Sequence, residues 1–166
     1  TGTGEVIMYT VVYNSLTGNT KLLADTIREV LPCDNDNNDI VFVGFWTDKG
    51  TADSKTIEYL KGLRDKKIFL FGTCGFGGSE TYFDRILTNV KSNIDSSNEV
   101  IGEYMCQGKM PSSVMERYLK MKESDNCPPN IDALIDNFDR ALSHPDEKDL
   151  EKLSQIVLQT LTNVIK

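Results

Sequence analysis

Four short apolar runs, each followed by a segment of helical periodicity, constrain the fold of this chain more than any other feature. The runs cover residues 6–13, 40–45, 67–72 and 100–106, and they are rich in β-branched and aromatic side chains. Continuous apolar character is typical of strands that are buried on both faces. Strands that alternate with helices form a parallel sheet covered by helices on both faces. The sequence therefore predicts a doubly wound α/β fold.

The segments between and after these runs show one apolar face at a period near 3.6 residues. They cover residues 21–31, 52–63, 82–90, 113–122, 131–142 and 149–165. We expect Ser79 to cap the third helix, and Ser113 with Glu116 resembles a capping box for the fourth. A length of 166 residues favours a single domain over 1–166, with 128–166 as a C-terminal helical extension packed on it.

Charge and composition exclude several classes of partner. The net charge of −7 argues against nucleic acid, whose binding depends on Lys and Arg at the phosphates, and against anionic membrane surfaces. No apolar run approaches the length of about 18 residues that a membrane helix needs. The four cysteines form no C-x-x-C pair and the chain has one histidine, so we expect no metal site. Free thiols favour a reducing cytoplasm.

Three loops that follow the first three strands are rich in Gly, Ser, Thr and Asn. They cover residues 14–20, 46–51 and 73–79. The carboxyl ends of parallel strands meet at one edge of a sheet, which is where ligands bind in this architecture. We therefore expect the three loops to converge on one site.

The first loop, "NSLTGNT", has the composition of a phosphate-binding turn. Its donors are the hydroxyls of Ser15, Thr17 and Thr20 and the amide of Asn19, at the start of a helix whose N-terminus attracts anions. Gly18 permits a positive φ or a close approach. Because the loop contains no Lys or Arg, neutral donors would hold the phosphate. That arrangement suits a permanently held monoester better than a triphosphate awaiting transfer.

Other phosphate loops fit the sequence less well. The nearest approach to a Walker A motif has five intervening residues and ends in Met110, and the glycines at 75–78 alone are too weak a dinucleotide signal. A phosphatase loop after Cys74 would need an Arg where Glu80 stands. A phosphoacceptor receiver domain would need acidic residues in place of Asn14 and its neighbour.

Ser15-Leu16-Thr17-Gly18-Asn19-Thr20 resembles the [ST]-x-T-G-N-T phosphate loop of flavodoxins at every specified position. The resemblance covers roughly residues 6–122 and implies FMN, with its phosphate in loop 14–20 and its ring between the other two loops. About eight residues separate Leu31 from Ile40, so the usual second strand is missing or vestigial. The stretch "DIVFVGFWTDKGTAD", with "SHPDEKDL" in the tail, resembles a divergent branch in anaerobic bacteria. Some members of that branch are linked to partner reductases, including those that act on bile pigments.

The same resemblance assigns FMN contacts to the second and third loops. The implied contact residues are Trp46, Thr47, Asp48, Lys49, Gly50, Thr73, Cys74, Gly75, Phe76, Gly77, Gly78 and Tyr82. In flavodoxins a peptide beside the flavin N5 reorients on reduction, and Gly50 is the candidate for this role. Lys49 would add a positive charge near the reduced ring. Trp46, Phe76 and Tyr82 are alternative ring-stacking residues, and Gln107 with Gly108 could reach the ring edge.

The resemblance implies an electron-transfer protein that shuttles electrons between redox partner proteins, a reductase donor and an acceptor enzyme. No catalytic residue is expected, because the sequence shows no paired general acid and base and no nucleophile with an adjacent base. Two alternatives remain open. One is an FMN-dependent NAD(P)H or quinone reductase, and the other is a non-redox binding module that keeps the flavodoxin fold.

Overall fold

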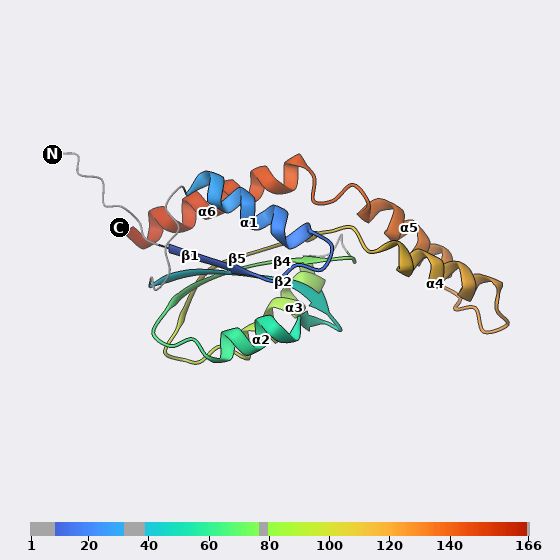
Figure 1. Cartoon of the computed structure of the whole chain (residues 1–166), viewed down its shortest axis with the longest axis horizontal. Coiled ribbons are helices and arrows are strands. Elements are labelled where there is room, and N and C mark those ends of the chain that lie inside the picture. Colours follow the sequence, from blue (N-terminus) through green and yellow to red (C-terminus); the bar gives the residue numbers. More distant parts are fainter. Residues whose placement is uncertain (1–8, 32–38, 77–79, 166) are drawn as a thin grey trace.

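The computed structural model describes residues 9–31, 39–76 and 80–165, and its elements alternate as the sequence predicts (Figure 1). Its elements are β1 (Tyr9–Tyr13), α1 (Asn19–Val30), β2 (Ile40–Asp48), β3 (Thr51–Ala52), α2 (Ser54–Lys61), β4 (Lys67–Cys74), α3 (Glu80–Lys91), β5 (Glu99–Gln107), α4 (Ser112–Glu123), α5 (Ile131–Ala141) and α6 (Glu147–Ile165). Residues 6–8 of the first predicted strand and the predicted cap Ser79 lie outside the described residues.

The sheet is parallel with the strand order β1-β2-β4-β5. The short strand β3 pairs with the end of β2, in the antiparallel direction. Within the described ranges, β1 has one strand neighbour, β2, so it lies at the edge of the sheet. This agrees with the predicted loss of the usual second strand.

Helices cover both faces of the sheet, which confirms the doubly wound fold. Helices α1 and α6 lie on one face, and α2 and α3 lie on the other (Figure 1). The first face buries aromatic residues of the strands, including Phe42 and Phe69, against α1 and α6. Leu153, Val157 and Leu161 of α6 are fully or almost fully buried there. The last helix of the tail is therefore part of the main core.

Helices α4 and α5 pack on each other and extend beyond the carboxyl edge of the sheet (Figure 1). They have a small core of their own around Tyr118, Ile131 and Phe138. The predicted capping box of this hairpin is wrong. Helix α4 has Pro111 at its N-cap without a side-chain cap, so Ser113 already lies inside the helix. No helix of the described residues combines the length and apolar character needed to cross a bilayer.

The second predicted loop, residues 46–51, is mostly strand. Strand β2 continues to Asp48, and a two-residue turn at Lys49 and Gly50 leads into β3. Both turn residues have positive φ, 54° and 82°, which fits a hairpin turn of type I′. Ala52, which the helical pattern includes, pairs with the end of β2, and α2 begins only after Asp53. A glycine-containing turn and a helix cap therefore override the periodicity here.

Candidate functional site

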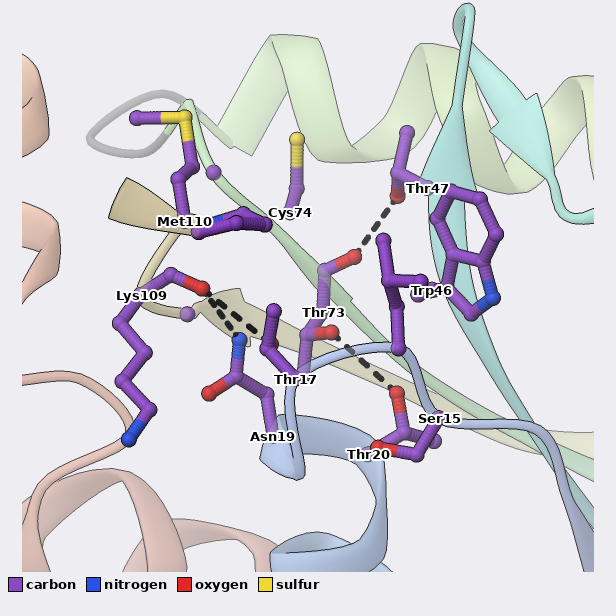
Figure 2. Close-up of a pocket in the computed structure, with 14 residues that line it drawn as sticks. Ser15, Thr17, Asn19, Thr20, Trp46, Thr47, Thr73, Cys74, Lys109 and Met110 are labelled. Carbon is purple, nitrogen blue, oxygen red and sulfur yellow. Dashed lines mark hydrogen bonds between the residues drawn. The ribbon is translucent and has the colours of Figure 1, made fainter. Parts of the chain in front are cut away.

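A pocket of about 80 Å³ lies at the carboxyl edge of the sheet (Figure 2). Its lining comes from the carboxyl ends of β2 and β4 and from the segments that follow β1, β4 and β5: Ser15, Leu16, Thr17, Asn19, Thr20, Trp46, Thr47, Thr73, Cys74, Gly75, Gly108, Lys109, Met110 and Pro111. Helix α1 leaves β1 toward one face, while α2 leaves β2 toward the other (Figure 1). The crevice between two such connections is where α/β sheets bind ligands. The three predicted loops thus meet at one site.

Loop 14–20 presents open backbone donors to the pocket. Gly18, with φ of 89°, is the N-cap of α1. The Ser15 hydroxyl accepts from the N–H groups of Gly18 at 3.1 Å and Lys21 at 3.3 Å. Among the described residues, the N–H groups of Asn19 and Thr20 have no acceptor, as expected in the first turn of a helix. The loop and the helix end therefore form a site that suits an anion.

Thr20 fastens this loop to the sheet. Its side chain is fully buried, and its hydroxyl donates to the Phe45 carbonyl at 3.0 Å. The same hydroxyl lies 3.3 Å from the Thr73 hydroxyl, so Thr20 connects α1 to both β2 and β4. That its hydroxyl donates to a phosphate stays a prediction.

The segment after β5, residues 108–111, forms a fourth wall that we call the strap. The Lys109 carbonyl accepts from Asn19 Nδ2 at 2.8 Å and from the Thr17 hydroxyl at 3.3 Å (Figure 2). A Cβ on Gly108 would lie 2.5 Å from Asn19 Nδ2, so only glycine allows this approach. The strap thus occupies two side-chain donors of the predicted phosphate loop.

Sequence reasoning missed most of the strap. It considered Gln107 and Gly108 but not Lys109, Met110 or Pro111, which also line the pocket. The available signal was the topology, because the carboxyl end of the fourth parallel strand lies at the same edge as the other three. At the level of sequence, Lys109 and Met110 are compared only with a Walker A pattern.

The second loop reaches the pocket only at its base. Trp46 and Thr47 line the pocket, whereas Asp48, Lys49 and Gly50 do not. The Gly50 carbonyl accepts from Asn89 Nδ2 of α3 at 2.9 Å, so the hairpin tip is held against α3 instead.

Asp53 holds the hairpin in this position. Its carboxylate is only 2% exposed and accepts from Asn14 Nδ2 at 2.6 Å, the Thr56 N–H at 3.1 Å, the Thr56 hydroxyl at 2.8 Å and the Trp46 N–H at 3.3 Å. The Asp53 N–H donates to the Trp46 carbonyl at 3.0 Å. Four donors compensate the burial of a carboxylate. The helical pattern that covered residue 53 hid this role.

The third loop contributes Thr73, Cys74 and Gly75 to the pocket. The exposed side chain of Phe76 and the side chain of Tyr82 are not part of the lining. Gly77 and Gly78 lie outside the described residues. Of the three aromatic candidates for ring stacking, Trp46 is therefore the one that the structure brings to the pocket (Figure 2).

Two amides fix the backbone of this third loop. The Gly75 carbonyl accepts from Gln107 Nε2 and from Asn137 Nδ2, both at 3.0 Å. Asn137 belongs to α5, so the α4–α5 hairpin contacts the site directly. Beside it, burial raises the pKa of the Cys74 thiol, which therefore stays protonated near neutral pH. A buried, protonated thiol is a poor nucleophile, as expected from the sequence.

His144 lies with Asp146 and Asp149 at the start of α6. The two aspartates accept from each other's N–H groups at 2.9 Å, which is a capping box, and His144 Nδ1 lies 2.6 Å from Asp149 Oδ2. The backbone hydrogen bond from Asp149 lowers the pKa of Asp146. Capping of α6 accounts for this cluster of side chains.

Comparisons with known proteins agree with this geometry. The model of the flavodoxin domain family matches residues 10–158. A flavodoxin-like domain-containing protein BilS of Clostridium symbiosum is 33% identical, covering 92% of this chain and 95% of the relative. A BilS protein of Clostridioides difficile is 34% identical, covering 87% and 90%. The fold resembles a flavodoxin of Streptococcus pneumoniae, with a TM-score of 0.55 at 18% identity over 94% and 99% of the two chains. The chain therefore belongs to the flavodoxin family, whose cofactor is FMN.

Proposed function

We propose that this protein is an electron carrier that holds FMN at the carboxyl edge of its sheet and exchanges electrons with separate redox proteins, a reductase donor and an acceptor enzyme. The observation that carries the proposal is the open N-terminus of α1 within loop 14–20, where the N–H groups of Asn19 and Thr20 face no acceptor among the described residues. Such a site suits the phosphate of FMN.

The residues of the pocket fit the two ends of FMN differently. A volume of about 80 Å³ has room for a phosphate group, whereas pockets for whole cofactors reach about 300 Å³ or more. We therefore place the phosphate inside, on loop 14–20, and the flavin ring at the mouth. There Trp46, Thr47 and the backbone at 73–75, which line the pocket, are available to orient it.

The protein's own part in the reaction is binding and orientation. When bound, FMN supplies the electron-transfer chemistry. The ionisable groups that line the pocket are Lys109 and the Cys74 thiol, which burial keeps protonated. This set supports a carrier over an enzyme with its own acid–base chemistry. The free thiols of Cys74, Cys106 and Cys127 support a cytoplasmic location.

The test is an absorbance titration of the purified chain with FMN, followed by stepwise reduction. We expect the flavin bands to sharpen on binding and the loaded protein to pass electrons to an added redox protein. Steady oxidation of NAD(P)H by the loaded protein alone would indicate a reductase instead. Failure to bind excess FMN would overturn the proposal.

A further inference from the structure

Lys109 is the charged residue of the pocket. Of the lining residues that the structure describes, it alone carries a formal charge. Loop 14–20 contains no Lys or Arg, and the ammonium of nearby Lys21 is paired with Asp25 at 2.9 Å. In a chain of net charge −7, this places one available cation beside the open helix N-terminus.

The backbone of Lys109 is fixed next to the phosphate loop. Its carbonyl accepts from Thr17 and Asn19, and its N–H donates to the His144 carbonyl at 3.0 Å. Its side chain is exposed and forms no ion pair with the rest of the described chain. A lysine has a flexible four-carbon stem. In the structure the Lys109 carbonyl faces Thr17 and Asn19 and the side chain runs away from them (Figure 2), so the ammonium meets an anion on the loop once the flexible stem turns toward it.

We infer that Lys109 is the specificity-determining residue for the phosphate of FMN, with its ammonium acting as the counter-ion that loop 14–20 lacks. This inference rests on the proposed FMN site. A phosphate monoester carries a charge of about −1.5 to −2 at neutral pH, which neutral donors stabilise but do not neutralise. Riboflavin has the same ring without the phosphate, so Lys109 should distinguish the two ligands.

The hydrogen bonds between the strap and loop 14–20 have to be replaced when an anion binds to the loop. An anion that takes the donors of Thr17 and Asn19 replaces the Lys109 carbonyl as their acceptor. The residue that loses these two hydrogen bonds is the same one whose ammonium then faces the anion. When the anion binds, the Lys109 carbonyl thus loses its contacts with Thr17 and Asn19, and the Lys109 ammonium gains a contact with the anion.

The experiment compares FMN and riboflavin binding, followed by flavin fluorescence, in Lys109→Met, Lys109→Arg and the wild type. Lys120→Met on α4 is the matched control, because Lys120 is exposed, lies outside the pocket lining and its replacement changes the net charge equally. For Lys109→Met we expect the FMN dissociation constant to rise about fivefold at low ionic strength, the effect of a partly exposed ion pair. Riboflavin binding should not change, Lys109→Arg should keep most of the FMN affinity, and Lys120→Met should match the wild type.

Salt dependence gives a second readout that does not need measurable riboflavin binding. The dissociation constant of FMN should rise with salt in the wild type and rise less steeply in Lys109→Met, because the screened pair is gone. Equal losses for both flavins, or an unchanged FMN affinity and salt slope in Lys109→Met, would overturn the inference while leaving the FMN site in place. A wild type that binds no FMN would instead overturn the proposed function.

Discussion

Loop 14–20 and the hairpin at 46–53 have similar positions in the sheet, but they differ in whether their backbone polar groups find partners within the chain. Both lie at the carboxyl ends of buried parallel strands at the same edge of the sheet, and the family resemblance implies cofactor contacts in both. In the first, backbone N–H groups at the start of α1 remain open. In the second, strand pairing, a tight turn and Asp53 satisfy the backbone internally, so only Trp46 and Thr47 reach the pocket. The two loops therefore differ in the backbone N–H groups that they leave available to a ligand.

The largest effect on the hairpin is expected from Asp53→Ala. This change removes the carboxylate that accepts the hydrogen bonds holding the hairpin in place. Four donors lose their partner and α2 loses its cap, so we expect the free energy of unfolding to fall by about 3 kcal/mol, measured in urea. The fluorescence of Trp46, the only tryptophan, should change as the hairpin loosens. Asp53→Asn keeps part of the acceptor geometry and should lose less. Equal stability of Asp53→Ala and the wild type would contradict this account of the hairpin.

Thr17→Ala tests the open loop by its effect on binding. The Thr17 side chain is half-buried, and its hydroxyl now donates to the Lys109 carbonyl. If it donates to the phosphate in the loaded protein, its loss should weaken FMN binding by about 2 kcal/mol, since hydrogen bonds to charged groups have this magnitude. The stability of the FMN-free protein should barely change. An unchanged FMN dissociation constant, measured by fluorescence titration, would remove this hydroxyl from the site.

Thr20→Val tests whether the Thr20 hydroxyl stabilises the position of loop 14–20 on the sheet or contributes to FMN binding. The replacement keeps the shape and removes the buried hydroxyl that donates to the Phe45 carbonyl. We expect a loss of about 1 kcal/mol or somewhat more in the free energy of unfolding, because the carbonyl of Phe45 loses a donor. FMN affinity should fall less than in Thr17→Ala. A larger loss of affinity than of stability would show that Thr20 serves the phosphate directly.

Gly50→Ala probes the hairpin tip with the smallest expected effect. A Cβ at this position meets open space, so the cost comes from the positive φ of 82° alone. We expect the free energy of unfolding to fall by about 1 kcal/mol. FMN affinity and reduction potential should not change, because Gly50 lies outside the pocket lining. A shift in the reduction potential of the bound flavin would instead indicate that Gly50 lies beside the flavin, as the family resemblance implies.

Local patterns were enough to predict the four parallel strands, the helices and the edge at which the pocket lies. The continuous apolar runs required burial on both faces, and the motif at 15–20 matched the family loop. Element ends were less predictable. Residues 47 and 48 continue β2 because Thr47 and Asp48 have antiparallel partners in β3, and Ala52 leaves the helical pattern for the same reason.

By itself, the sequence determined that this chain folds into a parallel sheet and that a turn whose composition suits an anion follows its first strand, because periodicity and turn composition act over a few residues. Only the tertiary structure decided which polar groups stay open. Thr20 finds its acceptor 25 residues away, Asn19 finds one 90 residues away, and Asp53 and Asn14 are 39 residues apart. Such partners meet only when the sheet brings strand ends together, so the strap and Lys109 were visible in no single stretch of the chain.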